Sequence, residues 1–343
     1  MIDIAIIGAG VMGAHYAKVL RDCADAHLCA IADLDARRAE GLARTYEVSS
    51  TYVSYEAMLA DERIDAVVVA TPDFAHREPV QACLAAGKQV LCEKPLAMTR
   101  EDCEAIAADV DRSGVKFMVS YGNRHRPNAQ RVKQTLQARE LGDLKHVAIR
   151  LNEKLSKTRT ISWLDRTSPV WFLLSHCVDT LRWLTDREFT EVYARATYGV
   201  VERRLGAHTP DVVSVVAQLE DGVTALLESA WILPDAYPSN VHFELEIIGE
   251  RGCINCDLFP RGLMVSADEA RILDYSFDVP GPLGKVQGWW AESVRYFIAC
   301  LESDATPAPT VRDGWAATEV LLAMDRSIQS GAPSAVEPLS SSL

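Results

Sequence analysis

The chain of 343 residues lacks both a long hydrophobic run and an excess of basic residues, and each absence excludes a class of function. Its apolar stretches all fall short of the roughly 20 residues that a membrane-spanning helix needs. The formal net charge of −13 at pH 7 argues against nucleic acids and anionic membranes as partners, because binding either needs a basic surface. A content of 48% hydrophobic and 24% charged residues is that of a globular protein with a substantial core. We therefore expect a small molecule as the partner.

A paired pattern of cysteines is also lacking. The nine cysteines are odd in number and scattered, and Ile2–Ile7 reads directly as a strand rather than as part of a signal peptide. We therefore expect no disulfide framework and a cytoplasmic location. Cys253 and Cys256 form one C-x-x-C, but no second pair or nearby histidine completes a zinc site. This favours two small residues on a strand and predicts no metal.

Short apolar runs alternate with amphipathic stretches over the first 120 residues, a pattern typical of a parallel sheet covered by helices on both faces. The expected strands are Ile2–Ile7, Leu28–Ala32, Ala66–Ala70, Gln89–Cys92 and Lys116–Ser120. The expected helices are Ala14–Asp22, Asp35–Tyr46, His76–Ala86 and Arg100–Arg112. The fold class is α/β, with a doubly wound parallel sheet in a domain of residues 1–122.

From residue 123 the pattern changes to strand-like runs joined by turn sequences such as Asp221-Gly222, which favours an antiparallel or mixed sheet. The expected strands are Val147–Asn152, Val192–Val201, Val212–Leu219, Val223–Trp231, Phe243–Gly249 and Gly262–Ser266. The expected helices are Asn128–Arg139, Trp171–Trp183, Trp289–Glu302 and Val311–Gln329. We therefore predict a second, α+β domain over residues 123–343.

The run Gly8-Ala9-Gly10-Val11-Met12-Gly13 matches G-x-G-x-x-G between a predicted strand and a predicted helix. In a dinucleotide site the first glycine permits the tight turn, the second lets the backbone approach the pyrophosphate, and the third allows close helix–strand packing. Asp33 follows the second strand, where a carboxylate holds the adenosine ribose hydroxyls. The alternative is a structural glycine turn beside a solvated aspartate. The order of strand, turn, helix, strand and acid favours a nicotinamide dinucleotide.

Asp33 also bears on which dinucleotide binds. A carboxylate repels the 2′-phosphate of NADP, whereas NADP sites usually place an arginine there. Arg37 and Arg38 follow a few residues later, but the pattern places them in the next helix. We expect NAD.

Glu93-Lys94-Pro95 follows a predicted strand, and with the glycine motif it carries a resemblance to a known family. The chain resembles the glucose–fructose oxidoreductase / inositol dehydrogenase family, also written Gfo/Idh/MocA, over nearly its whole length. The matching segments are Gly8–Gly13, Ala70–Pro72 with His76, Gly87–Leu96, Asn123-Arg124, Ser175–Asp179 and Leu181–Leu184. The resemblance implies a Rossmann domain joined to a domain with an open-faced sheet. It also implies NAD(P)-dependent oxidoreduction of sugars, polyols or their derivatives, in homodimers or homotetramers.

Taken with the glycine motif, the resemblance places the cofactor-binding residues. They are Gly8, Gly10, Val11, Met12, Gly13, Asp33, Thr71, Pro72, His76, Glu93, Lys94 and Asn123. Substrate contacts are expected from Arg124, Lys154, Trp163, Phe172 and His176. The catalytic residues are expected to be Lys94, His176 and Asp179.

The residues themselves support two of these assignments. Lys94 stands at the carboxyl end of a parallel strand, where doubly wound folds bind ligands, and its ammonium can stabilise charge on a reacting oxygen. His176 lies off the apolar stripe of its predicted helix, and an imidazole suits the removal of a hydroxyl proton. Asp179 follows within one turn and is expected to orient the ring. The alternatives are a solvated lysine and a histidine satisfied by a neighbouring carboxylate.

Two features bear on the substrate. Six basic residues against two acidic ones lie between Lys145 and Arg166, a segment that contains Lys154 and Trp163. It either meets an acidic substrate or is a solvated loop, and Trp163 either stacks on a sugar ring or packs in the core. Phe172 stands where many members of the family carry an aspartate, one turn before the histidine.

We therefore expect an NAD-dependent dehydrogenase that acts on a CH–OH group of a sugar, polyol or sugar-derived acid. Two other possibilities remain open. One is an enzyme of the same fold that retains NAD and cleaves glycosides or eliminates a group. The other is a non-catalytic NAD-binding protein.

Overall fold

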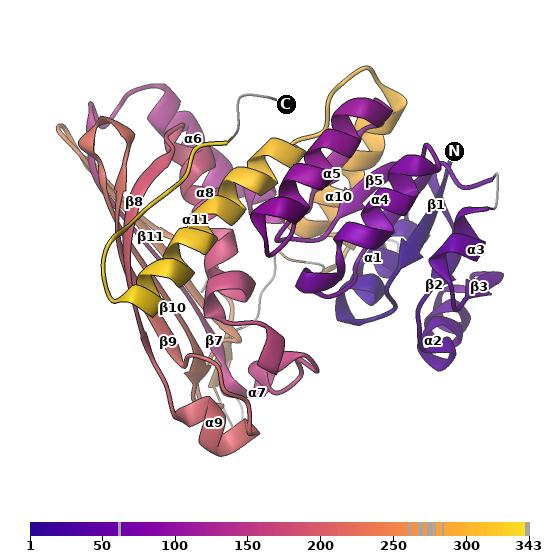
Figure 1. Cartoon of the computed structure of the whole chain (residues 1–343), viewed down its shortest axis with the longest axis horizontal. Helices are drawn as coiled ribbons and strands as arrows, with labels where there is room; N and C mark the ends of the chain where they lie inside the picture. The colour runs from indigo at the N-terminus through magenta and orange to yellow at the C-terminus, as the bar shows by residue number, and fades with distance from the viewer. Residues whose placement is uncertain are drawn as a thin grey trace. The chain divides into compact units, whose positions relative to one another are not determined.

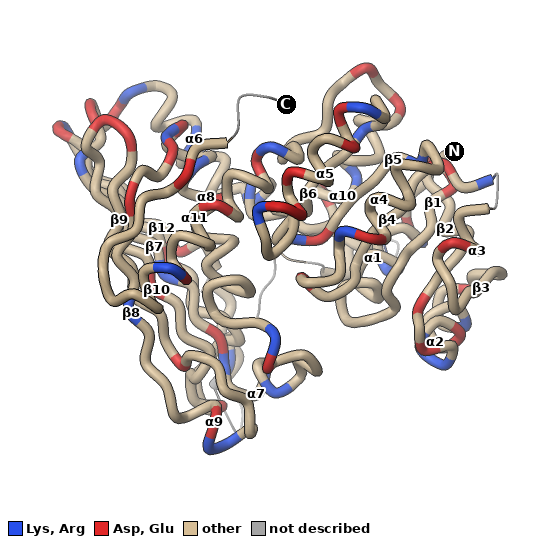
Figure 2. The backbone as a smooth tube through the Cα atoms, viewed as in Figure 1, with Lys and Arg blue, Asp and Glu red and all other residues tan. Residues whose placement is uncertain are grey.

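The computed structural model describes residues 1–60, 63–259, 262–266, 270–272, 277, 279–282 and 285–339. The chain forms two compact units, and the boundary after Gly122 is where the sequence pattern changes. The first unit contains Met1–Gly122 and Phe277–Trp315, and the second contains Asn123–Ser276 and Ala316–Leu339. Figure 1 shows the elements of each unit, and Figure 2 shows acidic and basic residues intermingled in both.

The first unit is built on a six-stranded parallel sheet of order β3-β2-β1-β4-β5-β6. The strands are β1 (Ile2–Ile7), β2 (Ala26–Ala32), β3 (Ser50–Tyr52), β4 (Ala66–Val69), β5 (Gln89–Cys92) and β6 (Phe117–Val119). The helices are α1 (Val11–Arg21), α2 (Ala36–Tyr46), α3 (Tyr55–Leu59), α4 (Arg77–Ala85) and α5 (Arg100–Ser113), with a 3₁₀ turn η1 (Asp73–Ala75). The strand order reverses at β1, which is where doubly wound folds bind their ligands. The predicted α/β class is confirmed.

The closing helix α10 (Trp289–Glu302) corrects the predicted division into domains. We expected residues 123–343 to form the second domain, but Phe277–Trp315 belongs to the first unit. The physical reason is the apolar face of α10, because Trp290, Val294 and Phe297 join the core that contains Tyr16 of α1. The Trp290 and Tyr16 rings lie 4.8 Å apart. A short ladder of β15 (Val279–Pro280) and β16 (Val286–Gln287) precedes this helix.

The second unit is built on a seven-stranded mixed sheet of order β12-β11-β7-β10-β9-β8-β17. Its strands are β7 (Leu144–Lys154), β8 (Phe189–Thr197), β9 (Val212–Leu219), β10 (Thr224–Leu233), β11 (Val241–Gly249), β12 (Cys253–Asp257) and β17 (Ser334–Ala335). The β7–β10 pair is parallel and the other pairs are antiparallel, which confirms the mostly antiparallel sheet. A separate ladder joins β13 (Met264–Ser266) and β14 (Ala270–Ile272). Residues 260 and 261, next to the predicted strand Gly262–Ser266, lie outside the described part.

Helices cover one face of this second sheet, as Figure 1 shows for α8 and α11. The helices that lie wholly or mostly in this unit are α6 (Pro127–Gln137), α7 (Leu155–Thr158), α8 (Ser175–Thr185), α9 (Val200–Leu205) and α11 (Val311–Ser330). A π-helical turn η4 (Val170–Leu174) leads directly into α8. The 3₁₀ turns are η2 (Gly122–His125), η3 (Leu164–Arg166) and η5 (Glu220–Gly222). In the described part of the chain, no helix is long and apolar enough to cross a membrane.

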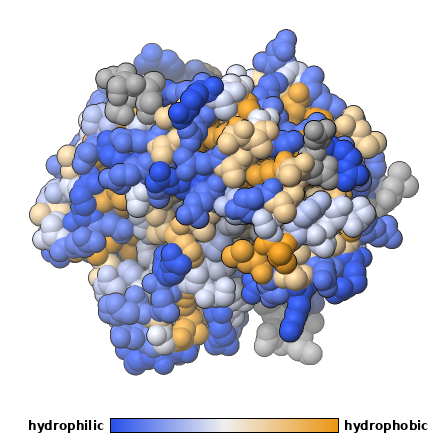
Figure 3. All heavy atoms as spheres, turned by 45° about the vertical axis from the view of Figure 1, so that its right-hand side comes forward, coloured by the Kyte–Doolittle hydropathy of each residue, from blue (hydrophilic) through white to orange (hydrophobic). Residues whose placement is uncertain are grey.

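The C-x-x-C lies on β12, as expected. Cys253 is exposed and Cys256 is half-buried, and all nine cysteines carry free thiols. Among the described residues, no group of His, Cys, Asp and Glu side chains is arranged to hold a metal. The surface in Figure 3 is mostly hydrophilic, with smaller apolar patches between.

Candidate active site

The glycine loop after β1 has the geometry of a pyrophosphate cradle. Gly8 has φ 103°, and a Cβ there would lie 2.5 Å from the carbonyl oxygen of Ala70. A Cβ on Gly13 would overlap the carbonyl of Gly8, whereas one on Gly10 would meet open space. Gly10 is the N-cap of α1, so unpaired backbone N–H groups of the first turn follow it. The loop therefore fits a dinucleotide, with close packing at two glycines and open space at the third.

Asp33 is fixed beside this loop by backbone donors. The N–H of Ala9 donates to Oδ2 of Asp33 at 2.7 Å, and the N–H of Asp35 donates to Oδ1 at 2.8 Å. Each carboxylate oxygen keeps a second lone pair, which can accept from a ribose hydroxyl. Leu34 is 92% exposed and Val53, after β3, is 59% exposed. Sequence reasoning missed these two apolar side chains, since their exposure depends on where the strands end.

The Glu93-Lys94-Pro95 turn rests on a buried tyrosine. The Tyr16 hydroxyl donates to Oε1 of Glu93 at 2.6 Å, and the hydroxyl of Ser120 lies 2.7 Å from the same phenol oxygen. The other oxygen of Glu93 accepts the backbone N–H of Lys94 at 3.1 Å. Burial and the nearby Glu93 charge raise the pKa of Tyr16 well above its usual value, so the phenol stays a donor. Tyr16 thus links the helix of the glycine motif to the turn that carries Lys94.

His76 joins two turns instead of facing a ligand. Its ring is 1% exposed, and its nitrogens lie 2.8 Å from the Pro95 carbonyl oxygen and 3.0 Å from that of Thr71. Burial lowers the pKa of this histidine. Because the ring has almost no open surface, we correct the expected cofactor contact of His76 to a supporting role. Thr71 and Pro72 are half-buried and stay predicted cofactor contacts.

In the second unit, His176 is half-buried, as is Phe172 four residues before it. Between Val170 and Arg182, a stretch described throughout, every residue is buried except Phe172 and His176. The Phe172 ring lies 6.5 Å from that of the fully buried Trp231, with an angle of 50° between the planes. The structure therefore presents the expected acid/base beside an aromatic side chain.

Asp179 has a partner that the sequence did not indicate. Its side chain is 1% exposed, and Arg124 donates to both of its oxygens, from Nη2 at 2.6 Å and from Nε at 3.1 Å. Such a two-point pair fixes both side chains. Asp179 is therefore the buried partner of Arg124, and its orientation of His176 stays a prediction. The substrate contact of Arg124 also stays a prediction, and its side chain is 11% exposed.

The remaining predicted residues of this unit differ in how open they are. Asn123 is buried and accepts from Nε of Arg126 at 2.9 Å, which makes it a supporting residue. Lys154 and Trp163 are half-buried and stay predicted substrate contacts. Arg150, near the start of the basic segment, lies on β7 of the sheet and pairs with Glu228 on β10 at 3.1 Å. The segment therefore does not act as a single basic patch.

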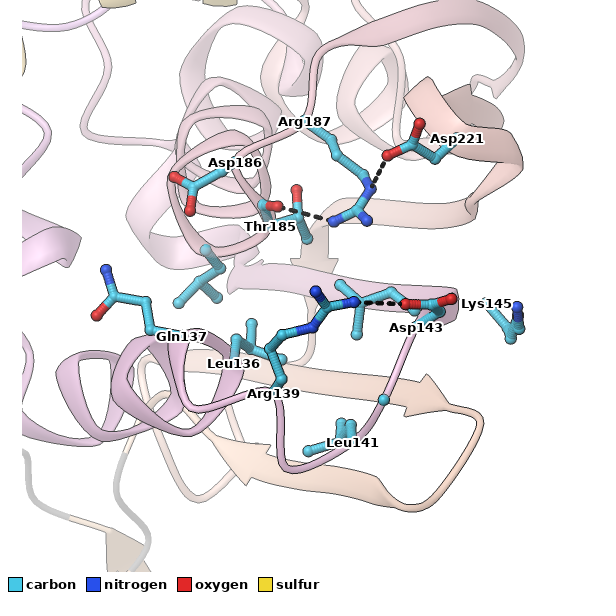
Figure 4. Close-up of a pocket in the computed structure, with 13 residues that line it drawn as sticks. Leu136, Gln137, Arg139, Leu141, Asp143, Lys145, Thr185, Asp186, Arg187 and Asp221 are labelled. Atoms are coloured by element: carbon cyan, nitrogen blue, oxygen red, sulfur yellow. Dashed lines mark hydrogen bonds and ion pairs between the residues drawn. The ribbon is translucent and has the colours of Figure 1, made fainter.

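A cavity of about 510 Å³ lies at the C-terminal end of α8 (Figure 4). It is lined from α6, from the start of β7 and from the residues that follow α8. Arg139 pairs with Asp143 at 2.9 Å and Arg187 with Asp221 at 3.3 Å. Its lining residues in the described part of the chain include none of those predicted for catalysis or binding. We assign this cavity no part in the reaction.

Comparison with known proteins decides the family. Residues 2–121 match the model of the oxidoreductase family with an NAD-binding Rossmann fold, Gfo/Idh/MocA, and residues 129–255 match the model of its C-terminal domain. The chain belongs to the Gfo/Idh/MocA family. Its first unit is the NAD-binding domain, and the enzyme is an NAD-dependent oxidoreductase acting on CH–OH groups.

Relatives of this Gfo/Idh/MocA enzyme match over its whole length. Inositol 2-dehydrogenase 1 of Saccharopolyspora erythraea is 30% identical, over 98% of this chain and 96% of the relative. Inositol 2-dehydrogenase of Rubrobacter xylanophilus is 28% identical, over 98% and 94%. The structure of scyllo-inositol dehydrogenase from Lactobacillus casei, with NAD(H) and scyllo-inositol bound, has a TM-score of 0.85 at 20% identity. It aligns over 98% of this chain and 99% of that one. This likeness confirms the fold.

One carboxyl of this Gfo/Idh/MocA enzyme, that of Asp325, has a raised pKa. Asp325 on α11 accepts from Nε1 of Trp171 at 2.8 Å, and burial raises the pKa of its carboxyl to about 6. Because the pKa of Asp325 is higher in the folded protein than in the unfolded chain, the protonated carboxyl favours folding at low pH. This contribution to the free energy of unfolding is lost as the pH rises from about 4 to 6. At pH 8 the ionised carboxyl therefore destabilises the fold by on the order of 1 to 3 kcal/mol.

Asp325→Asn is expected to raise the midpoint of thermal unfolding at pH 8 and to change it little at pH 4. The amide oxygen can still accept from Trp171, while the buried charge is removed. Thermal unfolding across this pH range measures the effect, with the exposed Asp304→Asn as the matched control. A variant less stable than the parent at pH 8 would show that the ionised carboxyl stabilises this helix.

Proposed function

We propose that this enzyme oxidises a secondary alcohol of a cyclic polyol or sugar to the ketone, with Lys94 and His176 as the catalytic pair. The turn that carries Lys94 is the observation that supports this most. Its backbone N–H is fixed by Glu93, which Tyr16 holds from the helix of the glycine motif. A lysine fixed relative to a dinucleotide loop is suited to bind the reacting oxygen next to the cofactor.

Each residue has one task in this proposal. His176 accepts the hydroxyl proton, while the Lys94 ammonium donates a hydrogen bond to the oxygen and stabilises its developing charge. NAD, when bound, would supply the hydride acceptor, so the carbinol carbon would lose a hydride while His176 takes the O–H proton. Asp33 would accept from the ribose hydroxyls, and the exposed Leu34 and Val53 would offer apolar surface to the adenine.

A screen of inositols, other cyclic polyols, sugars and sugar acids with NAD tests the proposal through the absorbance of reduced nicotinamide. Inositols come first, because relatives that match the whole chain are named inositol dehydrogenases. Net formation of NADH with a cyclic alcohol is expected. Turnover without net NADH, in protein that purifies with bound NAD, would instead favour glycoside cleavage or elimination. Tight NAD binding without turnover on any of these compounds would favour a non-catalytic role.

Asp33→Ser is expected to raise the ratio of kcat/KM with NADP to that with NAD by roughly tenfold or more, because it removes the carboxylate that faces the 2′-phosphate. Steady-state kinetics with both cofactors measures the ratio. Asp33→Asn is the matched control, since it removes the charge and keeps an oxygen that can accept from the N–H of Ala9. Preference of the unmodified enzyme for NADP would show that Asp33 does not select the cofactor.

We further propose that copies of the chain pair through the open face of the second sheet. Val216 and Leu226 are cross-strand neighbours there and are 53% and 45% exposed. Ala148 and Tyr193 extend the same row on the flanking strands. An apolar row of this kind is typical of an interface, and sedimentation velocity distinguishes a dimer or tetramer from a monomer. The nine free thiols support a cytoplasmic location.

A further inference from the structure

Phe172 supplies an aromatic surface beside His176. Phe172 and His176 are four residues apart, and they are the two half-buried residues in a stretch that is otherwise buried from Val170 to Arg182. Side chains four residues apart on a helical segment lie on the same face. A substrate held for proton transfer to His176 therefore also meets the Phe172 ring.

A buried tryptophan supports the Phe172 ring. It packs against Trp231, which is fully buried. The indole Nε1–H of Trp231 donates to the carbonyl of Pro210 at 2.6 Å, and its own carbonyl accepts from the hydroxyl of Thr158 at 2.7 Å. The indole nitrogen and the backbone carbonyl of Trp231 are thus both hydrogen-bonded, which fixes the aromatic side chain against which Phe172 packs. The packing of the fold thus sets the position of the aromatic surface next to His176.

This ring decides which substituents can lie against it. A phenyl ring offers no hydrogen-bond donor or conventional acceptor. A hydroxyl pressed against it gives up its bonds to water without replacement, at a cost of about 1 to 3 kcal/mol. A C–H or CH₂ group in the same place is favoured by burial of apolar area. An apolar surface discriminates against an added hydroxyl by roughly 10²-fold.

We infer that Phe172 is a specificity-determining residue that selects substrates with a deoxygenated carbon beside the carbinol. The substrate class is a cyclic alcohol or diol with an unsubstituted ring carbon facing Phe172, rather than a ring with a hydroxyl on every carbon. This inference rests on the proposed function, since it takes His176 as the residue that accepts the hydroxyl proton.

The test pairs two substrates with three forms of the enzyme. The substrates are trans-1,2-cyclohexanediol and myo-inositol, which share a six-carbon ring and differ in their further hydroxyls. The enzymes are the unmodified protein, Phe172→Leu and Phe172→Asn. The unmodified enzyme is expected to prefer the diol at least tenfold in kcat/KM, and Phe172→Leu is expected to keep this preference. Phe172→Asn supplies a donor and an acceptor, and it is expected to shift the ratio toward inositol by roughly 10- to 100-fold.

The outcomes separate this inference from the function on which it rests. Preference of the unmodified enzyme for inositol overturns the inference, and so does an unchanged ratio in Phe172→Asn. His176→Ala, measured in parallel, is expected to lose activity on both substrates. If no alcohol in the wider screen is oxidised, or if His176→Ala turns over normally, the proposed function fails and this inference fails with it. Oxidation of other alcohols in that screen, but of neither of these two substrates, overturns this inference alone. The midpoint of thermal unfolding of each variant, compared with that of the unmodified protein, shows whether the second unit, which contains Phe172 and His176, is folded.

Discussion

Replacing His176 or Lys94 with alanine is expected to lower kcat by a factor on the order of 10² to 10⁴, the usual effect of removing a group that moves a proton or stabilises charge. NAD affinity is expected to change little in His176→Ala, because the glycine loop and Asp33 lie in the other unit. Steady-state turnover measures the first effect, and titration of protein fluorescence with NAD measures the second.

His208→Ala is the matched control for this experiment. His208 is also in the second unit, and its side chain is 79% exposed and stacked on Tyr198. Its loss is expected to leave kcat unchanged. Near-normal turnover in His176→Ala would remove that residue from the mechanism and point instead to Asp165, which is exposed, or to Tyr121. Near-normal turnover in Lys94→Ala would show that the Glu93-Lys94-Pro95 turn has only a structural role.

The sheet of the first unit could be predicted because its strands are buried. Gln89–Cys92 was predicted with its observed bounds, since a short run of buried apolar residues bounded by glycine has one simple interpretation. The strand Ser50–Tyr52 was missed, because its residues are polar or aromatic and none of them is fully buried. Composition identifies a strand only where the core selects for apolar residues.

The end of β8 shows how a local signal misled the prediction. The β-branched residues up to Val201 predicted a strand, but β8 ends at Thr197 and Val201 belongs to α9. Asp211 accepts the N–H groups of Val200 and Val201 at 2.7 and 2.8 Å, which caps this helix from ten residues away. Gly199, with φ 117°, makes the turn between the two elements. The capping residue follows the helix in sequence, so a search for a preceding cap could not find it.

The candidate site was predicted where its residues lie in motifs and missed where they meet through the fold. Lys94 and His176 could be named from their motifs. The support of Glu93 by Tyr16 could not, because 77 residues separate the two. The same holds for Arg124 and Asp179, which are 55 residues apart. Helical spacing suggested only His176 as a partner of Asp179, whereas the tertiary fold also brings Arg124 there.

This ion pair leads to a large expected effect on stability. Asp179→Asn is expected to lower the free energy of unfolding by about 3 to 5 kcal/mol, because it leaves the Arg124 guanidinium buried without its counter-charge. The exposed pair of Arg139 and Asp143 gives the matched control. Asp143→Asn is expected to change stability by less than about 1 kcal/mol, because solvent screens that pair. Urea denaturation of the three proteins measures both effects.

Replacing both partners separates a buried pair from an orienting carboxylate. The double variant Arg124→Met with Asp179→Leu is expected to be more stable than Asp179→Asn, because neither charge remains buried alone. If Asp179 served only to orient His176, Asp179→Asn would lower kcat and leave the urea midpoint unchanged. If Asp179 serves as the buried partner of Arg124, the urea midpoint is expected to fall strongly, and kcat is expected to fall less than in His176→Ala. Measuring kcat and the urea midpoint on the same preparation of Asp179→Asn therefore decides between the two roles.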